Sequence, residues 1–557
     1  MGGNYLLDTF LSSFHDYTEY FKKYDLLFFK EDSNTSVAVT EVTLDNKDVV
    51  RTLRVNGKPD ASTFSMDIPT QLLSGHIPML LHRNPGKTAL VGIGSGSTAG
   101  AILQYKTVRK LDVIEISSAV VTAANKYFED INHQYFKDPR TRIHVEDAKT
   151  FFHTVNTVYD VIISEPSNPW ISGIGALYTR EYFTVLKDRL DDGGITAQWI
   201  QLYNISDETV GLVLHTFQSV FDKVTVWSMT GRDILLIGTK KGHLDPDYQQ
   251  IDSLLHSKEI QDSLGIINID SVESFLARQC LSQKTTAKMT ASKINSDTRP
   301  ILEYSAPVEQ FLGKNAGLIN QLDERVQAGN ELLFSRYNGN KPLSEKKLYQ
   351  IFKYIVINEP DNDKVLSYYF GKAVSSITNP EFFISLIELL EESENRSAIN
   401  IMYKKILSLS RDEKYLNKYA VFLLNWAETM SFPFNIEIQT QAVDLFKECL
   451  KGNGSKDKYY LNISLSYLKQ HDLKNAKQYI DTAIEYRKQY AGTPVLADST
   501  LSDEKVYYQA AVVYYNLMKD TADNPDQFKK QTKEFLNTVI KINPDNNSAQ
   551  KMFSELK

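Results

Sequence analysis

The chain has 557 residues, of which 42% are hydrophobic and 24% charged, and its formal net charge is −7, as in an ordinary globular protein. About two to four domains are expected at this length. No sustained run of Lys and Arg occurs and Cys280 and Cys449 are the only cysteines, which argues against nucleic-acid binding, a disulfide framework and a cysteine-based metal site.

The first 83 residues predict two segments. Residues 1–25 are expected to be an amphipathic lead-in, because large apolar side chains recur there at helical spacing. Residues 26–83 are expected to form a small β-domain and a connecting helix. Apolar and polar residues alternate between Asp25 and Ser65, and turn residues at 32–34, 45–46 and 56–57 separate the runs, which indicates an antiparallel sheet. Pro69 to Leu81 is predicted to be a helix.

The stretch from Thr88 to Ser117 predicts a nucleotide-binding turn. An apolar run ends in three glycines, Gly92, Gly94 and Gly96, and a helix-forming segment and a second apolar run that closes on Glu115 follow. Glycines allow the backbone to pass close to a ligand. A carboxylate about 20 residues further on is suited to holding ribose hydroxyls. Such a turn also occurs where glycine serves only to pack a helix on a strand.

Strands and helices continue to alternate beyond Glu115. Asp147 and Glu165 follow the next two predicted strands. Gly94, Glu115, Asp147 and Glu165 therefore stand at four strand ends, where ligands bind in parallel sheets. The terminal hairpin favours a class I methyltransferase-like (Rossmann-like) α/β fold for residues 84–321. The predicted order is helix 118–128, strand 142–145, helix 148–155, strand 159–164, helix 178–190, strand 194–202, helix 206–220 and a hairpin of strands 223–229 and 234–239.

Residues 322–557 are predicted to be all-helical. Ala442, Phe446 and Cys449 recur further on as Ala476, Ile480 and Ala483, a spacing typical of tetratricopeptide helix pairs. A plain helical bundle is the alternative for the part before residue 430. Repeats of this kind commonly present a surface to a protein partner, so such a partner is expected here.

Residues 26–239 resemble the spermidine synthase (polyamine aminopropyltransferase) family, closest to a bacterial branch in which this domain is fused behind membrane helices. The resemblance rests on the stretches LRVNGKPDAS, TQLLSGHIPMLLHRNPGKTALVGIGSGSTAG, DVIEIS, VEDAKTFF, YDVIISEPSNPWISGIGALYTREYF and GGITAQWIQLY. It implies that decarboxylated S-adenosylmethionine is a co-substrate and that no cofactor is tightly bound.

The resemblance also implies roles for individual residues. The three glycines would line the nucleoside and Glu115 would hold its ribose, while Asp147 and Ala148 would meet the adenine and Gln71 would reach across from the preceding helix. Glu165 takes the place of the acid that accepts the proton of the attacking amine. Its alternative role is that of a helix cap or an ion-pair partner at the strand end.

Three positions depart from the family pattern. Ser95 and Asn168 stand where the family has aspartates that hold the aminopropyl ammonium and the amine, and Thr70 replaces a tyrosine of the amine pocket. The loss of two acids should weaken amine binding unless others compensate, for which Glu146, Asp60 and Asp233 are candidates. Trp170 is expected either to form an aromatic wall of the substrate pocket or to serve in packing.

The leading hypothesis is a transferase that moves an aminopropyl group from decarboxylated S-adenosylmethionine to a small amine, with Glu165 as base. Because Ser95 is neutral, intact S-adenosylmethionine is an alternative donor, for transfer of a methyl or aminocarboxypropyl group. A third hypothesis is a weakened nucleoside-binding scaffold. We expect no metal and no nucleic acid, and a homodimer is one expected assembly. No apolar run approaches the roughly 18 residues of a membrane span, so we expect a cytoplasmic protein, or one attached to a membrane through a segment outside this sequence.

Overall fold

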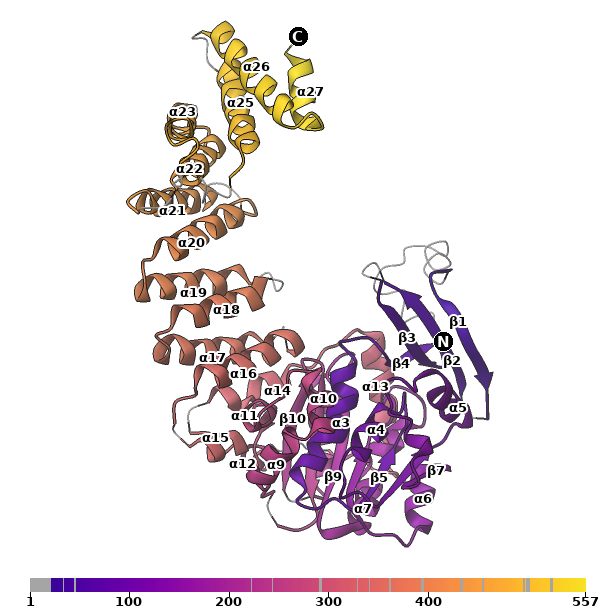
Figure 1. Ribbon diagram of the computed structural model, residues 1–557. Coiled ribbons are helices and arrows are strands. Elements are labelled where there is room, and N and C mark those ends of the chain that lie inside the picture. The colour runs from indigo at the N-terminus through magenta and orange to yellow at the C-terminus, as the bar shows by residue number, and fades with distance from the viewer. Residues whose placement is uncertain are drawn as a thin grey trace. The chain divides into compact units, whose positions relative to one another are not determined.

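The computed structural model describes residues 22–556 except 34, 45–46, 222, 243, 290–292, 328, 340, 360–361, 392–394, 431–433, 453–454, 494–495, 497–500 and 521–523. The chain divides into two compact units, Met1–Ser376 and Ile377–Lys557 (Figure 1). Most of the predicted lead-in, residues 1–25, lies outside the described residues, and the domain boundary at residue 322 stays a prediction.

The first unit begins with an antiparallel sheet, as the alternating pattern predicts, and this sheet has four strands. Its strands pair in the order of the chain: β1 (Asp25–Glu31), β2 (Ser36–Thr43), β3 (Val49–Val55) and β4 (Lys58–Ser62). Asn56 and Gly57 join β3 to β4, both with positive φ, the conformation that a tight hairpin turn requires. The sequence did not reveal β4 as a separate strand, because its five residues include Pro59 and two charged side chains.

An eight-stranded sheet follows, in the order β12-β10-β11-β9-β8-β5-β6-β7. Neighbouring strands from β9 to β7 are parallel, while β10, β11 and β12 are antiparallel, which confirms the methyltransferase-like class with its terminal hairpin. The strands are β5 (Lys87–Val91), β6 (Lys110–Glu115), β7 (Thr141–Val145), β8 (Tyr159–Ser164), β9 (Leu190–Gln201), β10 (Val224–Thr230), β11 (Asp233–Thr239) and β12 (Gln279–Leu281).

Alternate residues of the central strands enter two different cores. Leu90 of β5 packs in one apolar cluster, and its neighbours Ala89 and Val91 pack in the other. The first cluster is covered by α3, α4 and α5, and the second by α6, α7 and α8, so β5 is apolar along its length as a doubly covered parallel strand should be. These helices are α3 (Ile68–Leu81), α4 (Ser97–Leu103), α5 (Ser118–Tyr127), α6 (Ala148–Thr154), α7 (Arg180–Asp188) and α8 (Asp207–Gln218), with 3₁₀ turns η1 (Tyr135–Lys137) and η2 (Ile174–Tyr178).

The segment after β11 completes the first unit with short helices and the edge strand β12. Only three residues form β12, too few to give a readable sequence pattern. The helices are α9 (Tyr248–Leu255), α10 (Lys258–Gly265), α11 (Val272–Leu276), α12 (Gln283–Thr286), α13 (Ile301–Phe311), α14 (Leu318–Leu322), α15 (Leu333–Asn338), α16 (Glu345–Asn358) and α17 (Asp363–Ser376), with the 3₁₀ turn η3 (Glu324–Val326).

The described residues of the second unit form helices and no strand, as predicted. Ala442 and Phe446 on α21 and Ala476 and Ile480 on α23 are all buried, as their recurrence suggests. The tetratricopeptide interpretation stays a prediction. The helices are α18 (Pro380–Leu390), α19 (Arg396–Leu409), α20 (Glu413–Ala427), α21 (Phe434–Cys449), α22 (Asp457–Lys469), α23 (Leu473–Gln489), α25 (Asp503–Asp520), α26 (Pro525–Ile542) and α27 (Asn547–Glu555).

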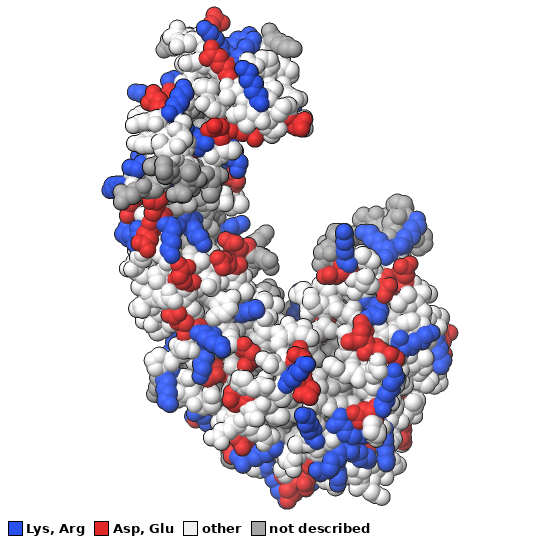
Figure 2. All heavy atoms as spheres, viewed as in Figure 1, with Lys and Arg blue, Asp and Glu red and all other residues white. Residues whose placement is uncertain are grey.

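Among the described residues, no helix is both long enough and apolar enough to cross a bilayer. On the face shown in Figure 2, Lys and Arg side chains are interspersed with Asp and Glu over both units.

Candidate functional site

The glycine turn lies between β5 and α4, as predicted. Gly92, Gly94 and Gly96 have φ values of 84°, 51° and 88°, in the left-handed region that glycine adopts without strain. A Cβ on Gly92 would collide with the backbone carbonyl of Glu165, and one on Gly96 would collide with the ring of Tyr135. The turn therefore needs glycine both for its conformation and for close approach to its neighbours.

Glu115 stands at the end of β6 and is tied to the glycine turn. Its Oε2 accepts a hydrogen bond from the Ile93 N–H at 3.1 Å, and its Oε1 accepts one from the Ser117 N–H at 2.9 Å. Burial raises the pKa of Glu115 to about 7, although both N–H groups favour the ionised form. The sequence thus places a carboxylate with unused lone pairs beside the turn.

Glu165 directly follows β8 and is held by two hydroxyl groups from different helices. Ser74 on α3 donates to its Oε1 at 3.0 Å, and Thr98 on α4 donates to its Oε2 at 2.7 Å. Burial, together with the nearby charges of Asp233 and Asp60, raises the pKa of Glu165 to about 8, although the two hydroxyl groups favour the ionised form. The result is a well-oriented carboxylate that takes up a proton readily near neutral pH.

One side of α3 carries the polar groups that join the strand ends. Thr70 donates to Asp233 Oδ2 at 3.0 Å, and Gln71 accepts a hydrogen bond from the Ser95 hydroxyl. Together with Ser74, these side chains lie within one turn of an otherwise apolar, almost wholly buried helix. Sequence reasoning missed Ser74, although its spacing of three residues from Gln71 places both on one helix face.

Two further carboxylates, those of Asp233 and Asp60, act on Glu165, and Asp67 lies near both of them. Asp233 begins β11, and burial raises its pKa to about 6. Burial also raises the pKa of Asp67, which accepts a hydrogen bond from Ser62. Asp60 on β4 pairs with Lys58 at 2.7 Å, and its charge raises the pKa values of Glu165, Glu115 and Asp67. Because the charges of Asp233 and Asp60 disfavour ionisation of Glu165, a cation bound beside these groups would be stabilised.

The loop after β8 brings Asn168 and Trp170 against Tyr203. Asn168 is buried and its Nδ2 lies 3.4 Å from the Tyr203 hydroxyl, which accepts its hydrogen bond. The Trp170 ring is half-buried and meets the Tyr203 ring edge to face at 5.9 Å, with the Lys58 ammonium 5.9 Å from its centre. The Asn168 side chain thus has a protein partner of its own.

Asp147 and Ala148 lie at the start of α6, after β7. Asp147 is exposed and caps this helix, since its Oδ1 accepts hydrogen bonds from the Thr150 N–H at 2.9 Å and the Thr150 hydroxyl at 3.0 Å. Ala148 is buried. Strands β8, β5, β6 and β7 are neighbours, so Glu165, the glycine turn, Glu115 and Asp147 follow one another along one edge of the sheet.

The requirement for glycine at position 92 leads to a prediction. We expect Gly92→Ala to lower the stability of the first unit by about 2–4 kcal/mol, from about 1 kcal/mol of left-handed strain and about 1–3 kcal/mol of overpacking against Glu165. Gly173→Ala is the matched control, because Gly173 has a similar φ of 85° and open space at its Cβ position. Urea denaturation should show a clearly smaller loss for the control, and equal losses would contradict the packing argument.

Comparison with known sequences identifies the domain that holds this site. The profile of the spermine/spermidine synthase domain matches residues 68–233. The polyamine aminopropyltransferase of Thermotoga petrophila is 32% identical over 120 residues, which cover 22% of this chain and 40% of that protein. Polyamine aminopropyltransferase 2 of Pseudomonas aeruginosa is 24% identical over 236 residues, which cover 41% of this chain and 65% of that protein. The chain therefore spans less than two thirds of the length of these relatives.

Among solved structures, the spermidine synthase of Thermotoga maritima shares 21% identity, with a TM-score of 0.35 over 40% of this chain and 77% of that one. Residues 68–233, which the domain profile matches, include Gln71 on α3, the glycine turn, Glu115, Asp147 and Glu165. Residues 68–233 of this chain thus match the profile of the spermine/spermidine synthase domain.

Proposed function

We propose that the protein transfers an aminopropyl group from decarboxylated S-adenosylmethionine to a small amine and releases methylthioadenosine. The observation that carries the proposal is the Glu165 carboxylate, held at the end of β8 by Ser74 and Thr98 and surrounded by further acids. The relatives named polyamine aminopropyltransferase support the same reaction.

The nucleoside would lie along the edge formed by β5, β6 and β7. The backbone of the glycine turn would approach it, and Glu115 would accept hydrogen bonds from the ribose hydroxyls while it remains fixed by the Ile93 and Ser117 N–H groups. Asp147 and Ala148 would flank the adenine. Gln71 would position Ser95 against the ligand, because it accepts a hydrogen bond from the Ser95 hydroxyl.

The amine would be held by carboxylates that differ from those of the family pattern. Asp233 and Asp60 lie close enough to Glu165 to raise its pKa. An ammonium about 4 Å from one carboxylate gains about 4 kcal/mol at the effective dielectric constant of a protein surface. Asp233 would offset one of the two acids that Ser95 and Asn168 replace, while the charge of Asp60 is shared with Lys58. Trp170 would form an aromatic wall beside them.

In the chemical step, the lone pair of the neutral amine nitrogen attacks the carbon bonded to the sulfonium sulfur. A carbon–nitrogen bond forms, the carbon–sulfur bond breaks, and its electron pair stays on sulfur as the thioether of methylthioadenosine. The proton released by the new ammonium passes to the Glu165 carboxylate. A base with a pKa of about 8 is well matched to this transfer near neutral pH.

Intact S-adenosylmethionine is the second candidate donor, because position 95 holds a neutral side chain. The Ser95 hydroxyl is engaged by Gln71 and by Ser97 at 2.8 Å, and no carboxylate at this position would repel that of the donor. Calorimetric titration with both donors separates the two candidates. Tight binding of the decarboxylated form alone would exclude the second.

The proposed reaction is tested by incubating the full chain with decarboxylated S-adenosylmethionine and putrescine. We expect equimolar release of methylthioadenosine and aminopropylated amine, measured by chromatography. We also expect kcat/KM to rise with pH through an inflection near 8, since only ionised Glu165 accepts the proton. The proposal fails if no methylthioadenosine is released with any of a panel of diamines, cadaverine and spermidine included.

A further inference from the structure

The tip of the β10–β11 hairpin is irregular at the point where it meets the site. Ser228 pairs with Ile234 and Thr230 with Asp233, so Met229 is an extra residue in β10 that has no partner on β11. Such a bulge redirects side chains and commonly lies next to active sites. Here Met229 Sδ lies 3.8 Å from the Ser74 hydroxyl, which is the group that donates to Glu165.

The end of α16 supports this tip from behind. The Tyr354 hydroxyl donates to the carbonyl of the bulged Met229, and the Gly231 N–H in the hairpin turn donates to the Asn358 carbonyl at 2.8 Å. Tyr354 is wholly buried, so water does not compete for this hydrogen bond. One turn of helix thus fixes the backbone on both sides of Thr230, whose hydroxyl donates to Asp233 at 3.1 Å.

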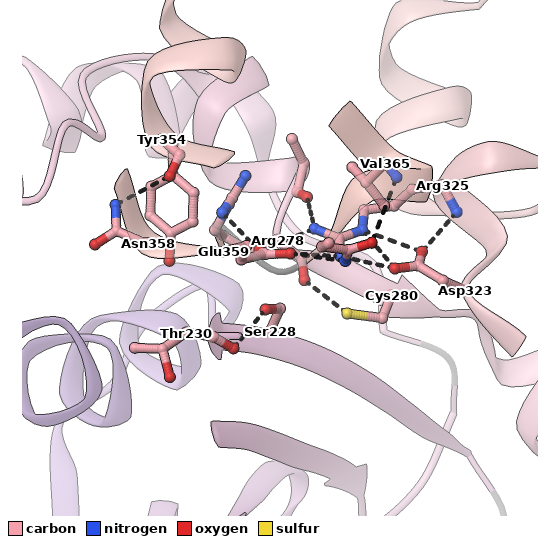
Figure 3. A network of polar contacts seen from close by, with 12 residues as sticks. Ser228, Thr230, Arg278, Cys280, Asp323, Arg325, Tyr354, Asn358, Glu359 and Val365 are labelled. Carbon is pink, nitrogen blue, oxygen red and sulfur yellow. Dashed lines mark hydrogen bonds and ion pairs between the residues drawn. The ribbon is translucent and has the colours of Figure 1, made fainter. Parts of the chain in front are cut away.

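A buried charge network fixes the end of α16 in turn (Figure 3). Glu359 accepts hydrogen bonds from Arg278 at 3.0 Å and from both terminal nitrogens of Arg325 at 3.0 and 2.8 Å. The Arg325 side chain also donates three hydrogen bonds to the Asp323 carboxylate, and the Arg278 guanidinium lies 3.1 Å from the centre of the Tyr354 ring. The four charged side chains are at most 2% exposed and sum to zero charge.

This support comes from outside the family domain. The matched region ends at residue 233, and Arg278, Arg325, Tyr354 and Glu359 all follow it. A continuous chain of contacts joins this network to the site. Tyr354 contacts Met229, Met229 contacts Ser74, and both Ser74 and Asp233 act on Glu165.

We infer that the end of α16 is a positioning element for the residues proposed to hold the amine. Tyr354 and Asn358 hold the β10–β11 tip so that Met229 contacts Ser74 and Asp233 lies beside Glu165. The inference rests on the proposed function and deepens it. Tyr354 contacts Met229 through its hydroxyl and Arg278 through its ring, and neither belongs to the residues proposed to hold the nucleoside. Its replacement should therefore weaken binding of the amine alone.

The test replaces Tyr354 with Phe, which keeps the ring over Arg278 and removes only the hydroxyl that holds Met229. Tyr349→Phe is the matched control, since Tyr349 is a half-buried tyrosine of the same helix. We expect Tyr354→Phe to raise KM for putrescine by about threefold to tenfold, and to leave Kd for methylthioadenosine within about twofold. The hairpin tip should also exchange its amide hydrogens faster, and the control should change none of these quantities.

Three results would overturn the inference. The first is an unchanged KM for the amine in Tyr354→Phe. The second is parallel weakening of amine and methylthioadenosine binding with a lower unfolding temperature, which would indicate a purely structural role. The third is an equal rate of hydrogen exchange of residues 226–234 in wild type and Tyr354→Phe.

Failure of the wild-type chain to turn over any amine would instead refute the proposed function. The hydrogen-exchange comparison would then decide the positioning role by itself.

Discussion

Replacing Glu165 with Gln should lower kcat for aminopropyl transfer by about 10²- to 10⁴-fold, the range that a positioned general base contributes. The amide keeps the shape of the side chain and can still accept a hydrogen bond from Ser74 or Thr98, but it cannot take a proton. Because the proposed function assigns Glu165 to the amine and not to the nucleoside, Kd for methylthioadenosine should stay within about twofold of wild type. Single-turnover kinetics and calorimetry measure the two quantities separately.

Glu309→Gln is the matched control for this variant. Glu309 is a buried glutamate that, like the half-buried Glu165, accepts hydrogen bonds from two hydroxyl groups, of Ser206 at 2.6 Å and Thr209 at 2.8 Å. These bonds hold the start of α8 and involve none of the residues proposed to bind substrate, so its replacement should leave turnover unchanged. An unchanged rate in Glu165→Gln, or an equal loss in the control, would remove Glu165 from the role of base.

The same variant should alter stability in a pH-dependent way. Because the pKa of Glu165 is raised to about 8, the folded chain keeps this proton between about pH 4.5 and pH 8, while the unfolded chain loses it. Ionisation then favours the unfolded state, so the free energy of unfolding falls as pH rises through this range. Glu165→Gln removes that cost. Its stability without ligand should therefore increase relative to wild type over this range and level off above pH 8.

Replacing Glu359 with Gln should destabilise the first unit by about 3–5 kcal/mol, the usual cost of breaking a buried ion pair. The substitution leaves Arg278 and Arg325 buried with only Asp323 to balance them. In calorimetry the transition of the first unit should shift to lower temperature, while that of residues 377–557 stays in place. Glu331→Gln is the control, because Glu331 forms an exposed ion pair with Lys284 and should leave the transition unchanged.

Acid should distinguish the two forms at position 359. The two arginines lower the pKa of Glu359 to about 2, so its ionisation stabilises the folded state above about pH 4.5, and this contribution is lost as pH falls toward 2. Wild type should therefore lose more stability than Glu359→Gln between pH 5 and 2. If the two lose stability in parallel, or if neither transition moves at pH 7, the network does not stabilise the fold as described.

The central fold could be predicted because its signals are local. An apolar run that ends in Gly92, Gly94 and Gly96 specifies strand, turn and helix, and each later strand ends at a polar residue such as Glu115 or Glu165. The short edge strands β4 and β12 escaped prediction, because three to five residues with polar or proline positions show no period.

The partners of the site residues could not be predicted, since they are set by packing between distant segments. Ser74 and Glu165 are far apart in the sequence, and so are Thr70 and Asp233. The sequence offered Asp233 as one of several acids, within what looked like a turn. Its location beside Glu165 depends on the docking of α3 against the last hairpin, which no motif encodes.

The polar side of α3 has a consequence for how the chain is made. Thr70 and Ser74 are synthesised long before their partners Asp233 and Glu165, so a growing chain cannot form these contacts until the hairpin has left the ribosome. Tyr354 arrives later still. In the proposed arrangement, the residues that would hold the nucleoside thus leave the ribosome before Glu165 and Asp233, which would act on the amine.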